Sequence, residues 1–90
     1  MKVYYDEYAL IHTYKRHHIE RHHIEEALSS GIEKMVYDEI HNSYIIFTNS
    51  KLAVVITNKY HLKSAFYPKA HYKYNKIRLG KIIKGGKQHV

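Results

Sequence analysis

The stretch YIIFTNSKLAVVI, residues 44–56, contains two apolar runs rich in β-branched and aromatic residues, at 44–47 and 52–56. Between them, Thr48-Asn49-Ser50-Lys51 supplies residues that favour turns. The pattern predicts two strands joined as an antiparallel hairpin. Because each run is apolar on consecutive residues, we expect both faces of these strands to be covered, as in the middle of a sheet.

Weaker strand signals flank this hairpin on both sides. Residues 33–37 predict an edge strand before it, and residues 62–67 predict a strand that Pro68 ends. A turn at residues 58–61 connects the last two strands. Short connections between consecutive strands favour an antiparallel meander of about four strands over parallel crossovers.

The segment after Pro68 is basic. Residues 69–79 predict a short helix with Ala70, Tyr74 and Ile77 facing inward. Residues 81–90, which include Gly85-Gly86, predict a flexible cationic tail.

The N-terminal third has helical spacing. Residues 6–16 predict a first helix with Tyr8, Ile11 and Tyr14 near one face, and residues 19–29 predict a second. The connection at residues 16–23 contains neither Gly nor Pro, so one bent or continuous helix is the alternative. The 90 residues therefore predict a single α+β domain, with two N-terminal helices packed on the meander.

Charge divides the chain into two parts. Residues 1–39 hold all 8 acids with 5 Lys and Arg, whereas residues 40–90 hold 10 Lys and Arg and no acid, for a net charge of +7. A positively charged surface attracts polyanions, so nucleic acid is the leading partner, followed by an anionic membrane or an acidic protein.

Several classes of protein are disfavoured by composition. The chain has no Cys, which excludes disulfides, thiolate zinc sites and a cysteine nucleophile. No apolar run approaches the roughly 20 residues that span a bilayer, and the charged opening lacks a secretory signal, so we expect a cytoplasmic site of action without membrane insertion. The basic half has no acidic cluster that could hold Mg²⁺, and we predict no cofactor.

Two short stretches carry a resemblance to a known superfamily. Its members are barnase, EndoU-type nucleases, tRNA-cleaving colicins and RelE-like toxins, all small ribonucleases. The first stretch, Arg16-His17-His18-Ile19 followed by Ile24 and Ala27-Leu28, resembles the basic–His–x–Ile turn of BrnT-type toxins, although His18 stands where those sequences usually have Gly. The second, Lys63-Ser64-Ala65-Phe66-Tyr67-Pro68, is similar to the hydroxyl–Ala–aromatic–Pro ending of the last core strand in several of these nucleases.

The resemblance implies a toxin-type ribonuclease that cleaves tRNA or mRNA by metal-independent attack of the 2′-OH on the adjacent phosphate. It also implies an acidic antitoxin or immunity protein that covers the basic face. The reaction needs a base, an acid and cations that hold the phosphate, and His, Lys and Arg suit these roles. The expected catalytic residues are His17, Arg16, Lys63, Ser64 and Tyr67.

Other cations and imidazoles are expected to contact RNA: His12, Lys15, Lys51, Lys69, His71 and Lys73. Strand alternation places Lys63 and Ser64 on opposite sides, with Ser64 on the face of Leu62 and Phe66, unless a bulge intervenes. His18 and His22, four residues apart, would be neighbours on one helix, but no third ligand is evident, so no metal site is predicted. A non-catalytic module that binds nucleic acid or protein is the alternative function, and the sequence leaves the oligomeric state open.

Overall fold

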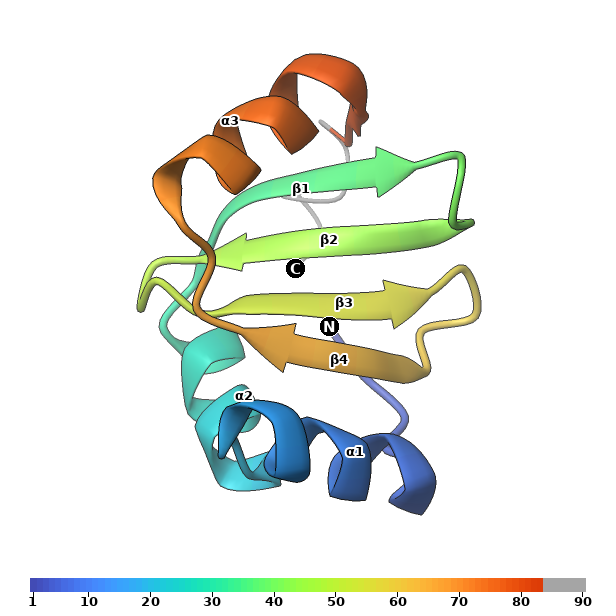
Figure 1. Ribbon diagram of the computed structural model, residues 1–90, viewed down its shortest axis with the longest axis vertical. Coiled ribbons are helices and arrows are strands. Elements are labelled where there is room, and N and C mark those ends of the chain that lie inside the picture. The colour runs from blue at the N-terminus through green and yellow to red at the C-terminus, as the bar shows by residue number, and fades with distance from the viewer. Residues whose placement is uncertain (84–90) are drawn as a thin grey trace.

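The computed structural model describes residues 1–83 (Figure 1). The helices are α1 (Glu7–His17), α2 (Arg21–Ser29) and α3 (Ala70–Leu79). The strands are β1 (Ile32–Asp38), β2 (Ser43–Thr48), β3 (Ala53–Thr57), β4 (Leu62–Phe66) and β5 (Lys81–Ile82). The α+β class and the two N-terminal helices before the strands are confirmed. Within residues 1–83 no helix is long and apolar enough to cross a membrane.

One antiparallel sheet has the order β4-β3-β2-β1-β5, which confirms the meander over its first four strands. Two strand predictions are wrong. The strand expected at an edge, β1, has neighbours on both sides, because Val36 pairs with Ile82 and Tyr37 with Lys81. Residues 81–82, expected in a tail, form β5, whereas residues 84–90 lie outside the described part of the chain.

Helices cover both faces of the sheet, which explains the consecutive apolar residues of β2 and β3. On one face, Ile46, Val54 and Ile56 pack against α1 and α2 in the larger core. On the other, Ile45 and Phe47 pack with Tyr72 and Ile77 of α3. We call this second side the α3 face. Figure 1 shows α3 and the α1–α2 pair at opposite ends of the view, with the strands between them.

The buried face of α1 differs from the one predicted. Tyr8, which is 79% exposed, Ile11 and Tyr14 point to solvent, whereas Ala9 and Thr13 are buried. Small side chains allow a helix to approach the strand beside it closely, which three large side chains would prevent.

The connection between α1 and α2 shows that they are two separate helices and not one continuous helix. His18 has the left-handed conformation, with φ 56°, and its N–H donates to the Tyr14 carbonyl, which ends α1. Glu20 and His23 then form a reciprocal capping box that begins α2. His18 therefore lies outside both helices and is not an i, i+4 neighbour of His22 on one helix.

The helix α3 begins one residue later than predicted, ends where predicted, and has a different inward side. Ala70 and Tyr74 are exposed, and Ile77 is half-buried as expected. Tyr72 and Lys76 join Ile77 on the side that meets the sheet.

Candidate functional site

A β-bulge in β4 determines where the predicted strand residues point. Ser64 pairs with Val55, and Leu62 pairs with Ile56, so Lys63 is an extra residue without a partner on β3. Paired residues share a face, which puts Ser64 beside Val55 on the α3 face. The prediction that Ser64 shares a face with Leu62 is therefore wrong.

The bulge lets the side chain of Lys63 cross β3 on the α3 face. Its ammonium donates to the Ser43 hydroxyl of β2 over 2.9 Å and lies 3.5 Å from the carbonyl oxygen of His41. The Ser43 hydroxyl, which is buried, donates to that same carbonyl over 2.8 Å. An ammonium has three N–H donors, so one remains for a ligand.

Beside Ser43 lies a buried carboxylate with several donors around it. The side chain of Asp38 is only 10% exposed. Its Oδ2 accepts from Lys76 Nζ over 2.9 Å and lies 2.8 Å from His41 Nδ1, and its Oδ1 accepts from the backbone N–H of Ile40 over 3.1 Å. Burial alone would raise the pKa of Asp38, but the hydrogen bonds from Lys76 and His41 outweigh it and lower the pKa to about 2.

The ionised carboxylate of Asp38 sets the tautomer of His41. A carboxylate can only accept, so Nδ1 of His41 carries the proton and donates it to Asp38. The lone pair of the neutral ring is then on Nε2. Because the side chain of His41 is 62% exposed, this nitrogen can exchange protons with a ligand.

Asp38 and Ser43 belong to one row of residues across the end of the sheet, which we call the polar row. Pairing connects Asp38 with Ser43 and Ser43 with Thr57. The row continues from Thr57, whose N–H donates to the His61 carbonyl, to His61, which forms a β-bridge with Tyr4. All five members lie on the α3 face by strand alternation.

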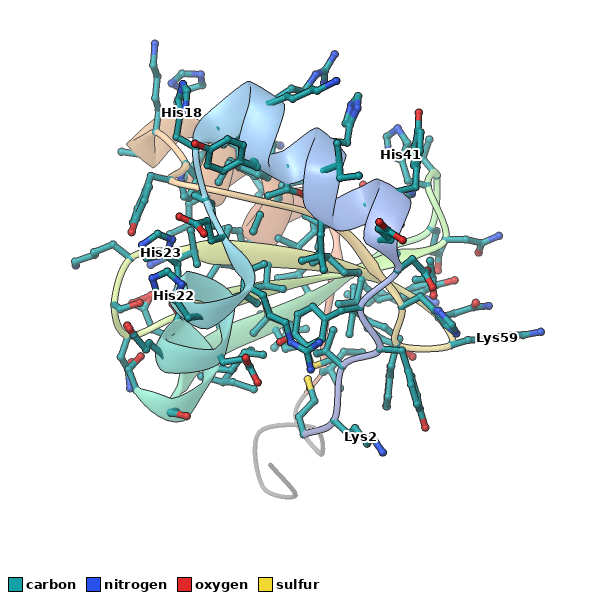
Figure 2. The ribbon with its side chains drawn as sticks, turned by 90° about the horizontal axis from the view of Figure 1, so that it is seen from below. Lys2, His18, His22, His23, His41 and Lys59 are labelled. Carbon is teal, nitrogen blue, oxygen red and sulfur yellow. The ribbon has the colours of Figure 1, made fainter. Side chains whose placement is uncertain are left out.

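The imidazole of His61, a member of the polar row, also contacts a carboxylate. His61 Nδ1 lies 3.1 Å from Asp6 Oδ2, and the His61 ring stacks on Tyr4 with centroids 5.2 Å apart. The β1–β2 and β3–β4 connections lie together at this end of the sheet (Figure 1). Figure 2 shows His41 and Lys59 here, on the other side of the molecule from the labelled His18.

The two charged parts of the chain meet in several side-chain contacts. Acids of residues 1–39 contact basic groups of residues 40–83, with Asp6–His61, Asp38–Lys76 and Glu39–Lys81 at or near the polar row and Glu33–Lys73 at the other end of β1. These contacts neutralise part of the positive charge. The Lys63 ammonium is different, because its partners are a hydroxyl and a carbonyl group.

The structure separates Lys63 from the predicted catalytic residues of α1. The His17 ring packs on Phe66 with centroids 5.7 Å apart, and Phe66 belongs to the cross-strand row of Ala53 and Phe47. Phe47 is four residues along β2 from Ser43, about 13 Å at ~3.3 Å per residue. Exposed Arg16 and Tyr67 lie in sequence next to His17 and Phe66. His17, Arg16 and Tyr67 thus lie at one end of β4, and the Lys63 ammonium is directed to the other.

The residues expected to contact RNA are distributed over several surfaces. His12 stacks on Tyr8 with centroids 5.9 Å apart, and Lys73 is paired with Glu33. His71 borders a groove beside α3. The remaining three are exposed and belong to α1, the β2–β3 turn and the start of α3: Lys15, Lys51 and Lys69. Across the described residues, no group of three or more His, Asp or Glu side chains is arranged to hold a metal ion.

Sequence reasoning missed His41, Asp38, His61 and Ser43. Asp38 and His41 are separated by two residues in the β1–β2 connection, and Asp38 Oδ1 accepts backbone N–H groups there, as Asp commonly does in turns. That spacing was a usable signal. The pairing of His61 with Asp6, 55 residues apart, had no local signal.

Comparison with known proteins identifies no relative: no family model, no curated protein and no solved structure matches this chain.

Proposed function

We propose that the protein is a metal-independent endoribonuclease whose reaction takes place at the polar row. The observation that carries the proposal is the His41 imidazole, held at Nδ1 by the buried carboxylate of Asp38, in a side chain that is 62% exposed. An imidazole oriented in this way by a carboxylate is suited to proton transfer near neutral pH. The resemblance of residues 16–28 and 63–68 to small ribonuclease toxins supports the same chemistry.

Each part of the reaction has a candidate group. His41 Nε2 takes the proton of the 2′-OH as the 2′-oxygen forms its bond to phosphorus. The free N–H of Lys63 stabilises the negative charge that develops on the phosphate oxygens. The 5′-oxygen takes a proton from water as the phosphorus–oxygen bond breaks, and the protonated His41 then returns its proton to the hydroxide left behind. The products are a 2′,3′-cyclic phosphate and a free 5′-OH.

Supporting residues hold these groups in place. Lys76 and the backbone N–H of His41 help to keep Asp38 ionised, and Ser43 directs the Lys63 ammonium along the polar row. Of the residues expected from sequence, the proposal keeps Lys63 as catalytic and assigns the catalytic imidazole to His41 in place of His17. The partner we propose for this surface is an acidic antitoxin or immunity protein, which would be attracted to Lys63 and Lys59.

The test uses two labelled oligonucleotides of one sequence, an RNA and its 2′-O-methyl counterpart, in EDTA. We expect the RNA to be cleaved to 2′,3′-cyclic phosphate ends, and the 2′-O-methyl strand to bind and stay intact. Intact RNA with salt-sensitive binding would overturn the proposal in favour of a non-catalytic binding module. Cleavage of the 2′-O-methyl strand would overturn the mechanism, since no 2′-OH is available there.

A further inference from the structure

A groove of about 600 Å³ runs between α3 and the C-terminal end of β1. Its helix side contains Tyr72, Asn75 and Leu79, and its strand side contains Asp38 and Ile40. In Figure 1, α3 lies beside β1. The groove adjoins the polar row, because Asp38 belongs to both.

The walls of the groove combine exposed apolar side chains with the uncharged amide of Asn75. Ile40 is 89% exposed and Leu79 is 73% exposed, on opposite sides of the groove. The Tyr72 ring is half-buried and packs edge-on against Phe66. The exposed carboxamide of Asn75 can both donate and accept hydrogen bonds. Exposed apolar side chains beside an uncharged amide suit a nucleobase, which proteins bind by apolar contact and by hydrogen bonds to its edge.

Charge argues against a phosphate in the groove itself. The Lys76 ammonium donates to Asp38, and the Lys81 ammonium lies 2.6 Å from Glu39 Oε1. Each cation that lines the groove is thus matched by a carboxylate. The Lys63 ammonium, in contrast, has only neutral partners. A nucleotide with its phosphate at Lys63 would therefore find a neutral surface for its base on the other side of Asp38.

The close packing of α3 on β1 keeps the groove in place. A Cβ at Gly80 would overlap the Val36 side chain and lie 2.8 Å from the Lys76 carbonyl oxygen. Glycine at this position lets the end of α3 approach β1 before the chain continues into β5. The two walls of the groove are therefore joined directly by Gly80 and Lys81.

We infer that this groove is the base-binding subsite for a nucleotide of single-stranded RNA whose phosphate lies at Lys63 and His41. The inference rests on the proposed function for the position of the phosphate. Binding of the base, however, does not require that the RNA be cleaved. The two claims can therefore fail separately.

The test compares nucleoside 5′-monophosphates with ribose 5-phosphate by NMR titration of the ¹⁵N-labelled protein. We expect the mononucleotides to shift the amides of residues 38–40 and 72–81, and ribose 5-phosphate to shift only those near Lys63 and Ser43. Asn75→Ala should weaken mononucleotide binding about fivefold, the loss expected for one hydrogen bond. Tyr74→Ala is the matched control, since Tyr74 is exposed on α3 but does not line the groove.

Three results would overturn the inference. The first is that mononucleotides and ribose 5-phosphate shift the amide signals of the groove residues equally. The second is equal weakening by Tyr74→Ala and Asn75→Ala, which would indicate non-specific stacking. The third is tighter binding of a mononucleotide than of a 2′-O-methyl trinucleotide, which would assign the groove to free nucleotides. If RNA is cleaved but the groove amides do not shift, the ribonuclease proposal stands and the subsite is rejected. If the groove amides shift but RNA is not cleaved, the subsite stands and the ribonuclease proposal is rejected.

Discussion

The Nδ1 atom of His41 lies 2.8 Å from Oδ2 of Asp38, three residues earlier in the β1–β2 connection. The imidazole is mostly exposed and the carboxylate is almost fully buried, so the pair joins the interior of the protein to its surface. Lys76 of α3 donates to the same carboxylate oxygen. A site built in this way depends on α3 being in place, and its ionisation should appear in the stability of the fold.

Acid should reduce the stability of the fold through Asp38. Its pKa falls from an ordinary 3.8 to about 2 because hydrogen bonds from Lys76 and His41 outweigh burial. The native state therefore favours the ionised carboxylate, which contributes about 2 kcal/mol to the free energy of unfolding near neutral pH. This contribution is complete above about pH 5 and is lost as the pH falls towards about 1.

Urea unfolding of the wild type and Asp38→Asn at pH 7 and pH 2 measures this contribution. The wild type should be the more stable protein at pH 7, and the difference should shrink by more than half at pH 2. Glu33, whose pKa is lowered by its hydrogen bond to Lys73, adds an acid dependence that both proteins share. A difference that does not change with pH would contradict the assigned ionisation of Asp38.

Removal of the Lys63 charge should slow cleavage much more than it weakens binding. Lys63→Gln keeps a long side chain that can donate to Ser43 but removes the positive charge at the phosphate. We expect the single-turnover rate of RNA cleavage to fall about 100-fold or more. Lys59→Gln is the control, because Lys59 is exposed in the β3–β4 connection. It should reduce the salt dependence of binding by about 0.7 in slope and leave the rate unchanged.

The left-handed conformation of His18 predicts a stabilising substitution. With φ 56°, a side chain at this position costs free energy that glycine avoids. His18→Gly should therefore raise the free energy of unfolding by about 0.5–1 kcal/mol relative to His18→Ala. The gain is not larger because glycine also gives the unfolded chain more conformational freedom. Thermal melting of the two variants compares them. A lower melting temperature for His18→Gly would contradict this account of the α1–α2 connection.

The same residue shows what could be predicted from sequence. Two helices were predicted, but one continuous helix stayed open as the alternative, because the break depends on a backbone conformation that His adopts without any Gly or Pro signal. The strands β2 and β3 were predicted from consecutive apolar residues, since burial on two faces leaves such a pattern. The buried side of α1 was not predicted, because α1 approaches the sheet through the small side chains of Ala9 and Thr13.

The candidate site was predicted in part for a similar reason. Lys63 was singled out, but the bulge that turns it towards Ser43 is a property of strand pairing, which local alternation cannot reveal. The polar row joins five residues from the N-terminus and four strand ends. Only the sheet topology brings them together. Lys76 contacts Asp38 because α3 packs beside the end of β1, where the β1–β2 connection begins, and no local sequence pattern specifies that contact.

The central claim is that His41, not His17, performs proton transfer in RNA cleavage, and the most direct test is the single-turnover cleavage rate of His41→Ala beside His17→Ala. Both side chains are exposed, so circular dichroism should show that both variants fold. We predict that His41→Ala loses about 100-fold or more of the rate in EDTA and that His17→Ala stays close to the wild type. Loss of cleavage in His17→Ala with full activity in His41→Ala would contradict the account.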